Sequence, residues 1–122
     1  MSVLLDSVVL IDHLNGISAA TRYLESLADG SISVISRAEV LAGLTLSAVP
    51  AVKEWLDRYP TFAIDRRTAD LAADLRRQYK WKLPDALQAA VAQQQGLKLA
   101  TRNTKDFPPR RHSFVIVPYS VK

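Results

Sequence analysis

The sequence predicts an α/β sandwich with a largely parallel sheet, and two observations lead to this fold class. Short apolar runs rich in Val, Ile and Leu, which are typical of buried strands, recur along the chain. Between them lie longer segments in which apolar residues return every three or four positions, as expected for helices. Strands that alternate with helices throughout a chain favour a parallel sheet covered by helices. We expect the 122 residues to form one domain, residues 1–122, with a core of its own.

The first half of the chain is predicted to contain two strands and four helices. Val3 to Leu5 is a short apolar run of the kind found in buried strands. Gly16 and Gly30 end the next two helical segments, because Gly commonly follows a helix C-terminus. Ser36 has the residue type preferred at a helix N-cap. The predicted elements are strands at 3–5 and 32–35 and helices at 7–14, 17–27, 36–46 and 49–59.

The second half is predicted to contain three strands and two helices. Pro84 suits the first turn of a helix, and Gly96 follows the last helical position of the same segment. The Pro108-Pro109 pair marks a loop before the final strand. The predicted elements are strands at 62–64, 97–101 and 114–117 and helices at 68–79 and 84–95.

The composition excludes several classes of protein. Hydrophobic residues make up 48% of the chain, so it is globular rather than disordered. It contains no Cys, which excludes disulfides, thiol catalysis and zinc sites built on Cys. No basic segment precedes an apolar one as in a secretion signal, and no apolar run approaches about 18 residues. We therefore expect a cytoplasmic protein with no membrane partner.

Charge is divided unevenly between the two halves of the chain. Residues 1–60 carry a net charge of −3 and residues 61–122 a net charge of +7, which together give +4. A basic surface beside an acidic cluster suits a polyanion such as a nucleic acid. The same charge could instead form a solvated face or a docking surface for an acidic protein.

Four acidic residues stand out as candidates for chemistry: Asp6, Glu39, Asp85 and Asp106. Asp6, Glu39 and Asp106 each follow a predicted strand, whereas Asp85 begins the helix before the fourth strand. Ligands of parallel sheets bind beyond the carboxyl ends of the strands. Carboxylates there are costly to desolvate unless a positive charge compensates them. A divalent cation is therefore a candidate ligand.

Each of these acids also has a structural explanation. The segment from Ser36 to Glu39 fits a capping box with Glu39 as its third helical residue. Asp85 would favour a helix N-terminus through the helix dipole, and Asp6 and Asp106 could cap a helix or a turn. Five other aspartates lie at polar helix or turn positions and are expected to be solvated: Asp12, Asp29, Asp57, Asp70 and Asp74.

Four segments carry a resemblance to a known family. They are residues 4–11, 36–43, 84–92 and 99–107, and each contains one of the four acids. In this order and at this approximate spacing they resemble PIN-domain ribonucleases, most specifically the VapC toxins of bacterial toxin–antitoxin pairs. The resemblance covers essentially the whole chain. It implies a PIN-like three-layer α/β/α sandwich with a central, mainly parallel sheet and the acids at one edge.

The resemblance also implies an activity and its residues. It implies endonucleolytic cleavage of RNA with Mg²⁺ or Mn²⁺, and an oxygen ligand set without His or Cys favours such hard cations. Asp6, Glu39 and Asp85 match the first three acidic positions of the family. The fourth position is shared by two residues, because many PIN domains have an acid where this chain has Asn103. The resemblance implies that Asn103 supplies a neutral ligand oxygen or orients a water, and that Asp106 supplies the charge directly or through water.

Further residues are expected to support the acids and the substrate. Three hydroxyl residues look like groups that position the carboxylates, namely Ser7, Ser36 and Thr101. The first candidates for RNA contacts are Arg66, Arg67, Arg102 and Lys105. VapC-like proteins are held inactive by a cognate antitoxin and usually form homodimers, so we expect both partners here.

Other functions fit the residues less well. A phosphatase of the haloacid dehalogenase type needs a second Asp two positions after the first, where this chain has Val8. A response-regulator receiver needs adjacent acids after its first strand, but Ser7 follows Asp6. His13 and His112 match no catalytic triad and are expected at the surface. The main alternative is a catalytically inactive PIN-like module that binds RNA or protein.

Overall fold

The computed structural model describes residues 2–121 and contains the predicted parallel sheet. The strand order is β3-β2-β1-β4-β5, and every neighbouring pair is parallel. All five strands are short, and the two edge strands have two residues each. Their bounds are β1 Val3–Leu5, β2 Gly30–Ser33, β3 Thr61–Phe62, β4 Lys98–Ala100 and β5 Val115–Ile116.

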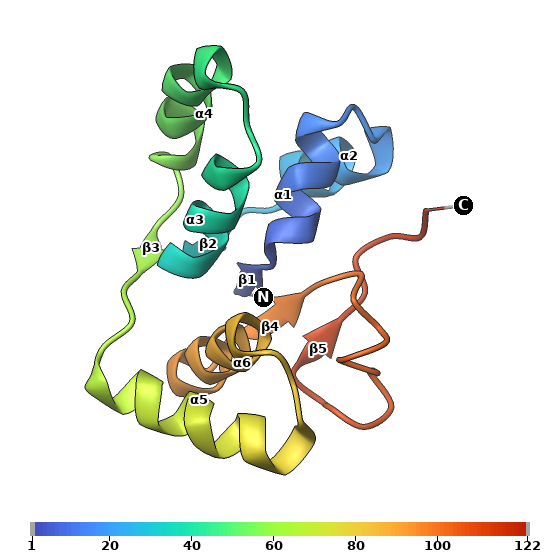
Figure 1. The fold of residues 1–122 in the computed structure, drawn as a ribbon. Helices are drawn as coiled ribbons and strands as arrows, with labels where there is room; N and C mark the ends of the chain where they lie inside the picture. Colours follow the sequence, from blue (N-terminus) through green and yellow to red (C-terminus); the bar gives the residue numbers. More distant parts are fainter. Residues whose placement is uncertain (1, 122) are drawn as a thin grey trace.

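Six α-helices connect these strands, and they fall close to the predicted ranges (Figure 1). Asp6 caps the first of them, because its side chain accepts the Ser7 backbone N–H. Gly96 ends the last with a φ of 66°, a left-handed conformation that Gly adopts without strain. The helices are α1 Ser7–Leu14, α2 Ser18–Ser26, α3 Val34–Ala42, α4 Val49–Leu56, α5 Arg66–Tyr79 and α6 Leu83–Gln95, with a short 3₁₀ turn at Leu46–Ala48.

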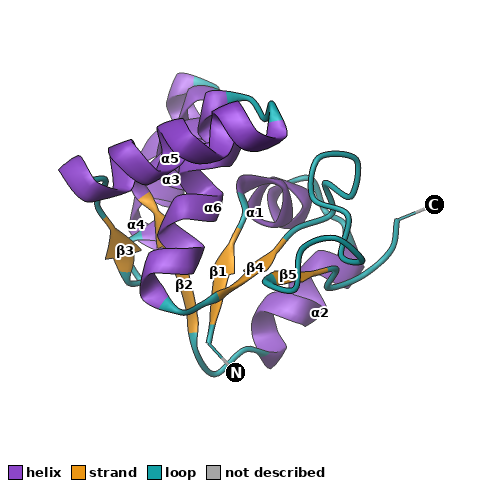
Figure 2. Cartoon of the chain, turned by 90° about the horizontal axis from the view of Figure 1, so that it is seen from below, coloured by secondary structure: helices purple, strands orange, loops and turns teal. Residues whose placement is uncertain are grey.

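The alternation of side chains along the central strands divides the core into two layers. Leu4 and Leu99 pack with α5 and α6 on one face of the sheet. Val3, Leu5 and Ala100 pack on the other face with residues of α1, α3 and α4. Figure 2 shows the strands running between helices on either side. The predicted three-layer α/β/α arrangement is therefore confirmed, and its cause is the two-residue period of a strand.

The start of α3 differs from the prediction. The second strand ends at Ser33 rather than at residue 35, and the helix begins at Val34. The Ser33 hydroxyl caps this helix by accepting the backbone N–H groups of Ile35 and Ser36, at 3.1 and 3.2 Å. The predicted capping box is wrong, since Ser36 and not Glu39 is the third helical residue. The side chain of Glu39 is consequently not needed for capping.

The strand order reverses between β1 and β4. The chain runs from β1 outward to β2 and β3, then returns through α5 and α6 to β4 on the other side of β1. Ligands of such sheets bind where the order reverses, beyond the carboxyl ends of these two strands. Asp6 follows β1 and Thr101 follows β4 at this point. No helix among residues 2–121 is both long and apolar enough to span a bilayer.

Candidate active site

Asp6 lies at the centre of the site and is held by uncharged donors. Its Oδ1 accepts the Ser7 backbone N–H at 2.9 Å and the Gln88 side-chain amide at 3.2 Å. The Thr101 hydroxyl donates to its Oδ2 at 2.6 Å. Only 6% of the residue is exposed. Within residues 2–121, Asp6 makes no ion pair, so its orientation is fixed while its charge is left uncompensated.

Gln88 of α6 connects Asp6 to α3 on the other face of the sheet. This role was not predicted from the sequence. The Gln88 amide donates to the Ser36 hydroxyl at 2.6 Å as well as to Asp6, and its carbonyl accepts the Ser33 hydroxyl. The Ser36 hydroxyl in turn donates to the Leu5 carbonyl at 3.1 Å. The signal for Gln88 was a single polar residue among the small apolar residues of a buried helix face. This network fixes α3 and α6 against the end of β1.

The other three predicted acids lie close enough to Asp6 to perturb one another. Burial raises the pKa of Asp85 to about 6, and the charges of Asp6, Asp106 and Glu39 add to the rise. Loss of solvent contact also raises the pKa of the Glu39 carboxyl, although the residue as a whole is exposed. A hydrogen bond with Ser7 opposes that rise, and the charge of Asp6 adds to it. The fold therefore brings the four acids within electrostatic range of one another.

Asp106 is fixed by the loop that follows β4. Its backbone N–H donates to the Asn103 side-chain oxygen at 3.3 Å, and the Asn103 amide donates to Asp106 Oδ2 at 3.1 Å. The Thr101 hydroxyl accepts the Asn103 N–H at 3.0 Å, and the Trp81 indole donates to the Asp106 carbonyl at 2.8 Å. Asn103 and Asp106 thus form one unit, in which the amide orients the carboxylate.

The types of side chain in this arrangement suit a divalent cation, but the distances between them are too long for them to bind one ion together. Buried, mutually repelling carboxylates gain most from a bound cation, and oxygen ligands suit Mg²⁺ or Mn²⁺. As the side chains lie, no three acidic or histidine residues between positions 2 and 121 are close enough together to hold one metal ion. The four carboxylates would have to draw closer around a cation.

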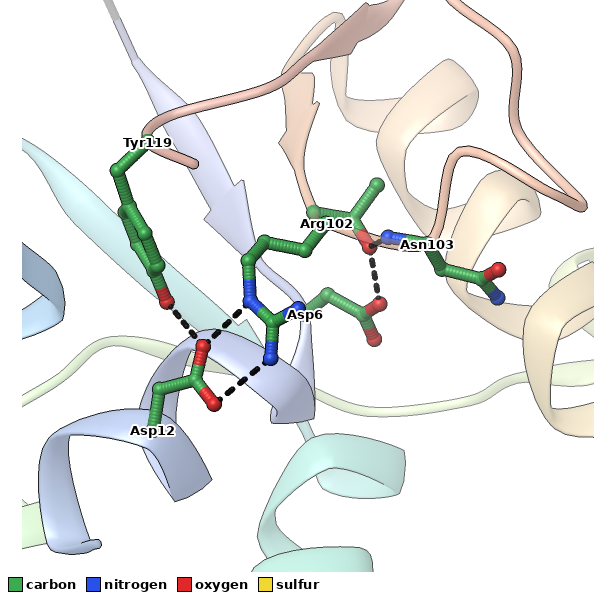
Figure 3. A network of polar contacts seen from close by, with 6 residues as sticks. Asp6, Asp12, Arg102, Asn103 and Tyr119 are labelled. Atoms are coloured by element: carbon green, nitrogen blue, oxygen red, sulfur yellow. Dashed lines mark hydrogen bonds and ion pairs between the residues drawn. The ribbon is translucent and has the colours of Figure 1, made fainter. Parts of the chain in front are cut away.

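Asp12 is the principal correction to the predicted site (Figure 3). It was expected to be solvated, but it is only 7% exposed. The Arg102 guanidinium binds it through two contacts of 2.6 and 2.9 Å, and the Tyr119 hydroxyl donates to it at 2.7 Å. The hydrogen bond from Arg102 is the main cause that lowers the pKa of Asp12. Arg102, predicted to contact RNA, is therefore already engaged by a buried carboxylate.

The remaining predicted residues are distributed unevenly. Lys105 is exposed in the loop beside Asp106. Arg66 and Arg67 begin α5, a helix length of about 20 Å from Tyr79 at its other end. Tyr79 and Asp106 line one surface hollow, so the acids lie near the end of α5 that is far from Arg66 and Arg67. The structure therefore does not bring these two arginines to the acids. Their contact with RNA stays a prediction.

The histidines differ from one another. His112 was expected at the surface but is buried, with its ring edge-on to those of Tyr79 and Trp81. Burial and the nearby Arg111 charge lower the pKa of His112. His13 is half-buried, and its ring nitrogen Nδ1 lies 2.8 Å from the Thr21 hydroxyl. His112 lines a hollow together with Asp106. That neither histidine takes part in the reaction stays a prediction from the sequence.

This fold with four clustered acids is that of a known class. A model of the PIN domain family matches residues 3–109. The chain therefore belongs to the PIN domain family. It is similar to Ribonuclease VapC10 from Mycobacterium tuberculosis, with 40% identity over 114 residues that cover 87% of this chain and 86% of that protein. The resemblance seen in the sequence is confirmed by this match.

Solved structures give the same assignment. A toxin-antitoxin complex from Klebsiella pneumoniae contains a chain with a TM-score of 0.91 and 35% identity, covering 98% of this chain and all of that one. FitAcB from Neisseria gonorrhoeae has a TM-score of 0.79 and 25% identity, with 98% and 99% coverage.

Proposed function

We propose that this protein is a metal-dependent endoribonuclease and the toxin of a toxin–antitoxin pair. One observation carries the proposal. Burial raises the pKa of Asp85 to about 6, and the charges of Asp6, Asp106 and Glu39 add to the rise, so the four acids lie within electrostatic range of one another. Carboxylates gathered without an internal cation destabilise a fold, which is understandable if they serve a ligand. The relatives support the substrate and partner, since one bears the name ribonuclease and another belongs to a toxin-antitoxin complex.

Each residue has a distinct task in this proposal. Asp6 is oriented by Thr101 and Gln88, so it requires no rearrangement of its own to present a charge. Glu39, Asp85 and Asp106 add charge from α3, α6 and the loop after β4. Together they would hold Mg²⁺ or Mn²⁺, which when bound supplies an activated water and stabilises the charge that develops on the phosphate. Asn103 orients the Asp106 carboxylate through two hydrogen bonds. Its side-chain oxygen would also be available as a neutral metal ligand.

The partners follow from the same comparison. RNA is the substrate class, and the basic second half of the chain suits it. A cognate antitoxin is expected to hold the protein inactive, because neighbouring structures are toxin-antitoxin complexes. The homodimer remains a prediction that rests on the family resemblance alone.

The second candidate function is that of a catalytically inactive module that binds RNA or protein. Loss of one or more of the acids would favour it. All four are present, and three of them contribute to the raised pKa of the fourth. The intact acidic cluster therefore supports an enzyme.

Metal dependence gives the direct test. Purified protein stripped with EDTA should not cleave single-stranded RNA, and cleavage should return with Mg²⁺ or Mn²⁺. Ca²⁺ should restore little, because it coordinates more ligands at longer and less regular distances. Asp6→Asn purified in parallel measures contaminating nuclease. Cleavage that persists undiminished in EDTA, and is absent from the Asp6→Asn sample, would contradict the proposed use of metal.

Glu39→Gln separates function from folding at a second position. The change keeps the size of the side chain and removes its charge. Glu39 does not cap α3, so thermal stability should stay within about 0.5 kcal/mol of the parent, as for an ordinary surface substitution. Cleavage should nevertheless fall severely. A variant with ordinary activity would remove Glu39 from the site.

A further inference from the structure

A hollow of about 270 Å³ opens beside Asp106, on the side of the site formed by the turn between α5 and α6. Its lining includes Tyr79, Lys80 and Trp81 from that turn. Lys105 and Arg111 come from the loop that also carries Asp106. The hollow therefore joins the acids to a surface that combines aromatic rings with positive charges.

The three cations of this hollow are available to a ligand. Lys80, Lys105 and Arg111 are exposed, and within residues 2–121 none of them forms an ion pair with a carboxylate. Arg77 and Arg102 differ, because they are paired with Asp74 and Asp12. Three unpaired cations in the lining of one hollow, against one carboxylate, Asp106, are suited to phosphate groups.

The aromatic part of the hollow is rigid. Tyr79 stacks on Trp81 with ring centroids 4.5 Å apart and planes 22° apart, and it meets His112 edge-on at 5.0 Å. Trp81 is itself held by Phe107 and by its hydrogen bond to the Asp106 carbonyl. Tyr79 still keeps 38% of its surface exposed. An exposed ring on a fixed support can stack with a base at little entropic cost.

The turn that presents these groups has an uncommon backbone. Lys80 adopts a φ of 59°, in the left-handed region that residues other than Gly seldom occupy. Its N–H donates to the Arg76 carbonyl at 2.8 Å, and the Arg76 guanidinium donates to the Trp81 carbonyl at 2.7 Å. These contacts end α5 at Tyr79 and fix the direction of the chain that follows. As a result Tyr79, Lys80 and Trp81 all line the hollow.

We propose that this hollow is a nucleotide subsite, in which the base next to the scissile phosphate stacks on Tyr79 while Lys80, Lys105 and Arg111 bind the adjoining phosphates. The inference rests on the proposed function and extends it by assigning a substrate-binding surface. Single-stranded RNA fits because its bases are free to stack, whereas a duplex keeps them paired. Of the four acids, Asp106 belongs to the lining of the hollow.

An acidic peptide is the competing occupant of a basic hollow. The exposed aromatic ring favours RNA, because a base has two flat faces that stack on a tyrosine and an acidic side chain has none. The two occupants are separable, since RNA affinity and antitoxin affinity can be measured on the same variants.

The test measures the affinity of a labelled single-stranded RNA of mixed sequence for the full chain carrying Asp6→Asn, so that the RNA survives. Adding Tyr79→Ala should weaken binding about 5- to 100-fold, which corresponds to the loss of one stacked base. Tyr79→Phe keeps the ring and should bind like the parent. Lys80→Gln and Lys105→Gln should each reduce the slope of log affinity against log salt by about 1.

Lys53→Gln is the matched control, because it removes an exposed lysine of α4 that lies outside the hollow. It should leave affinity and slope almost unchanged. Circular dichroism of every variant verifies folding, and if Tyr79→Ala proves misfolded, the Lys80→Gln and Lys105→Gln slopes decide the question. Parent-like RNA binding by the Tyr79→Ala and lysine variants would overturn the subsite, as would a selective loss of antitoxin binding. Cleavage by the protein without these substitutions tests the proposed function separately, so each can fail without the other.

Discussion

Asp6 and Asp12 are two buried carboxylates at opposite ends of α1, and they are treated in opposite ways. Asp6 is 6% exposed and Asp12 is 7% exposed. Consecutive residues of the loop after β4 reach them, Thr101 donating to Asp6 and Arg102 to Asp12 (Figure 3). Asp12 therefore receives a full positive charge from within the chain, whereas Asp6 receives only neutral donors.

The difference teaches how a fold separates structural acids from functional ones. A carboxylate paired with a guanidinium of the same chain has its charge neutralised, and here the pair links α1 to the loop that follows β4. A carboxylate held by hydroxyl and amide groups is oriented but keeps its charge for a ligand. Burial alone does not distinguish the two, and the identity of the donor does.

The largest effect should come from Asp6→Asn. Under the proposed function, cleavage should fall by about a thousandfold or more, because the cation would lose a charged ligand and metal assistance is worth several kcal/mol. The fold should remain, and the metal-free protein should be at least as stable since repulsion is relieved. A ribonuclease assay and thermal unfolding on one sample measure both. Full activity, or loss of secondary structure, would remove Asp6 from the catalytic role.

Asp12→Asn should act on stability instead of chemistry. Breaking the pair leaves Arg102 without its counter-charge, and we expect a loss of about 2 kcal/mol. That value lies below the figure for a fully buried pair because the Arg102 side chain is 30% exposed. Urea unfolding of Asp12→Asn, Arg102→Gln and the double variant should show coupling between them. Normal stability with lost cleavage would erase the distinction between the two acids.

Asp85→Asn should increase the free energy of unfolding of the metal-free protein by a smaller amount that depends on pH. Burial raises the pKa of Asp85 to about 6, from an ordinary value of 3.8. A raised pKa means that the folded state favours the protonated acid. That stabilisation is complete below about pH 3.8 and is lost as the pH rises to about 6.

At pH 7 the variant should therefore exceed the parent by about 1 kcal/mol, after allowance for solvent screening. Thermal unfolding in EDTA at several pH values measures the difference, which should shrink toward pH 4. Added Mn²⁺ should then stabilise the parent more than the variant. An equal response of both proteins to Mn²⁺ would exclude Asp85 as a ligand.

Tyr119→Phe should have the smallest effect. It removes one hydrogen bond to Asp12 while the two contacts from Arg102 remain. We expect a loss of about 0.5–1 kcal/mol, typical of one partly exposed hydrogen bond. Chemical denaturation of the two proteins side by side gives the value, and cleavage should be unchanged. An activity defect in this variant would connect Asp12 to the reaction.

Much of the fold could be predicted because it is encoded locally. The parallel sheet and the six helices follow from apolar periodicity and from glycines such as Gly96. The start of α3 could not be predicted in the same way, because Ser33 and Ser36 both have the residue type of an N-cap. Tertiary contacts decided between them. Gln88 contacts both hydroxyls, but the Ser36 hydroxyl donates to the Leu5 carbonyl, whereas the Ser33 oxygen accepts the N–H groups of Ile35 and Ser36 and caps the helix.

The positions of candidate residues were predictable where they follow strands and unpredictable where their partners are distant in the sequence. Strand ends led to Asp6 and Thr101. Asp12 is paired with a residue 90 positions away, and a polar residue in a helix is solvated far more often than it is buried. The hollow beside Asp106 combines two separate segments, so its aromatic and basic residues did not form a motif in the sequence.

The parallel pairing of β1 with β4 also sets when the site can exist. The hydrogen bond between Thr101 and Asp6 joins residues 95 positions apart. At roughly 5–20 residues per second, synthesis of that interval takes about 5–20 s. Until β4 is made, β1 lacks one of its two neighbours and Asp6 lacks its orienting hydroxyl. A nascent chain therefore cannot assemble this centre before Thr101 has been synthesised and β4 has paired with β1.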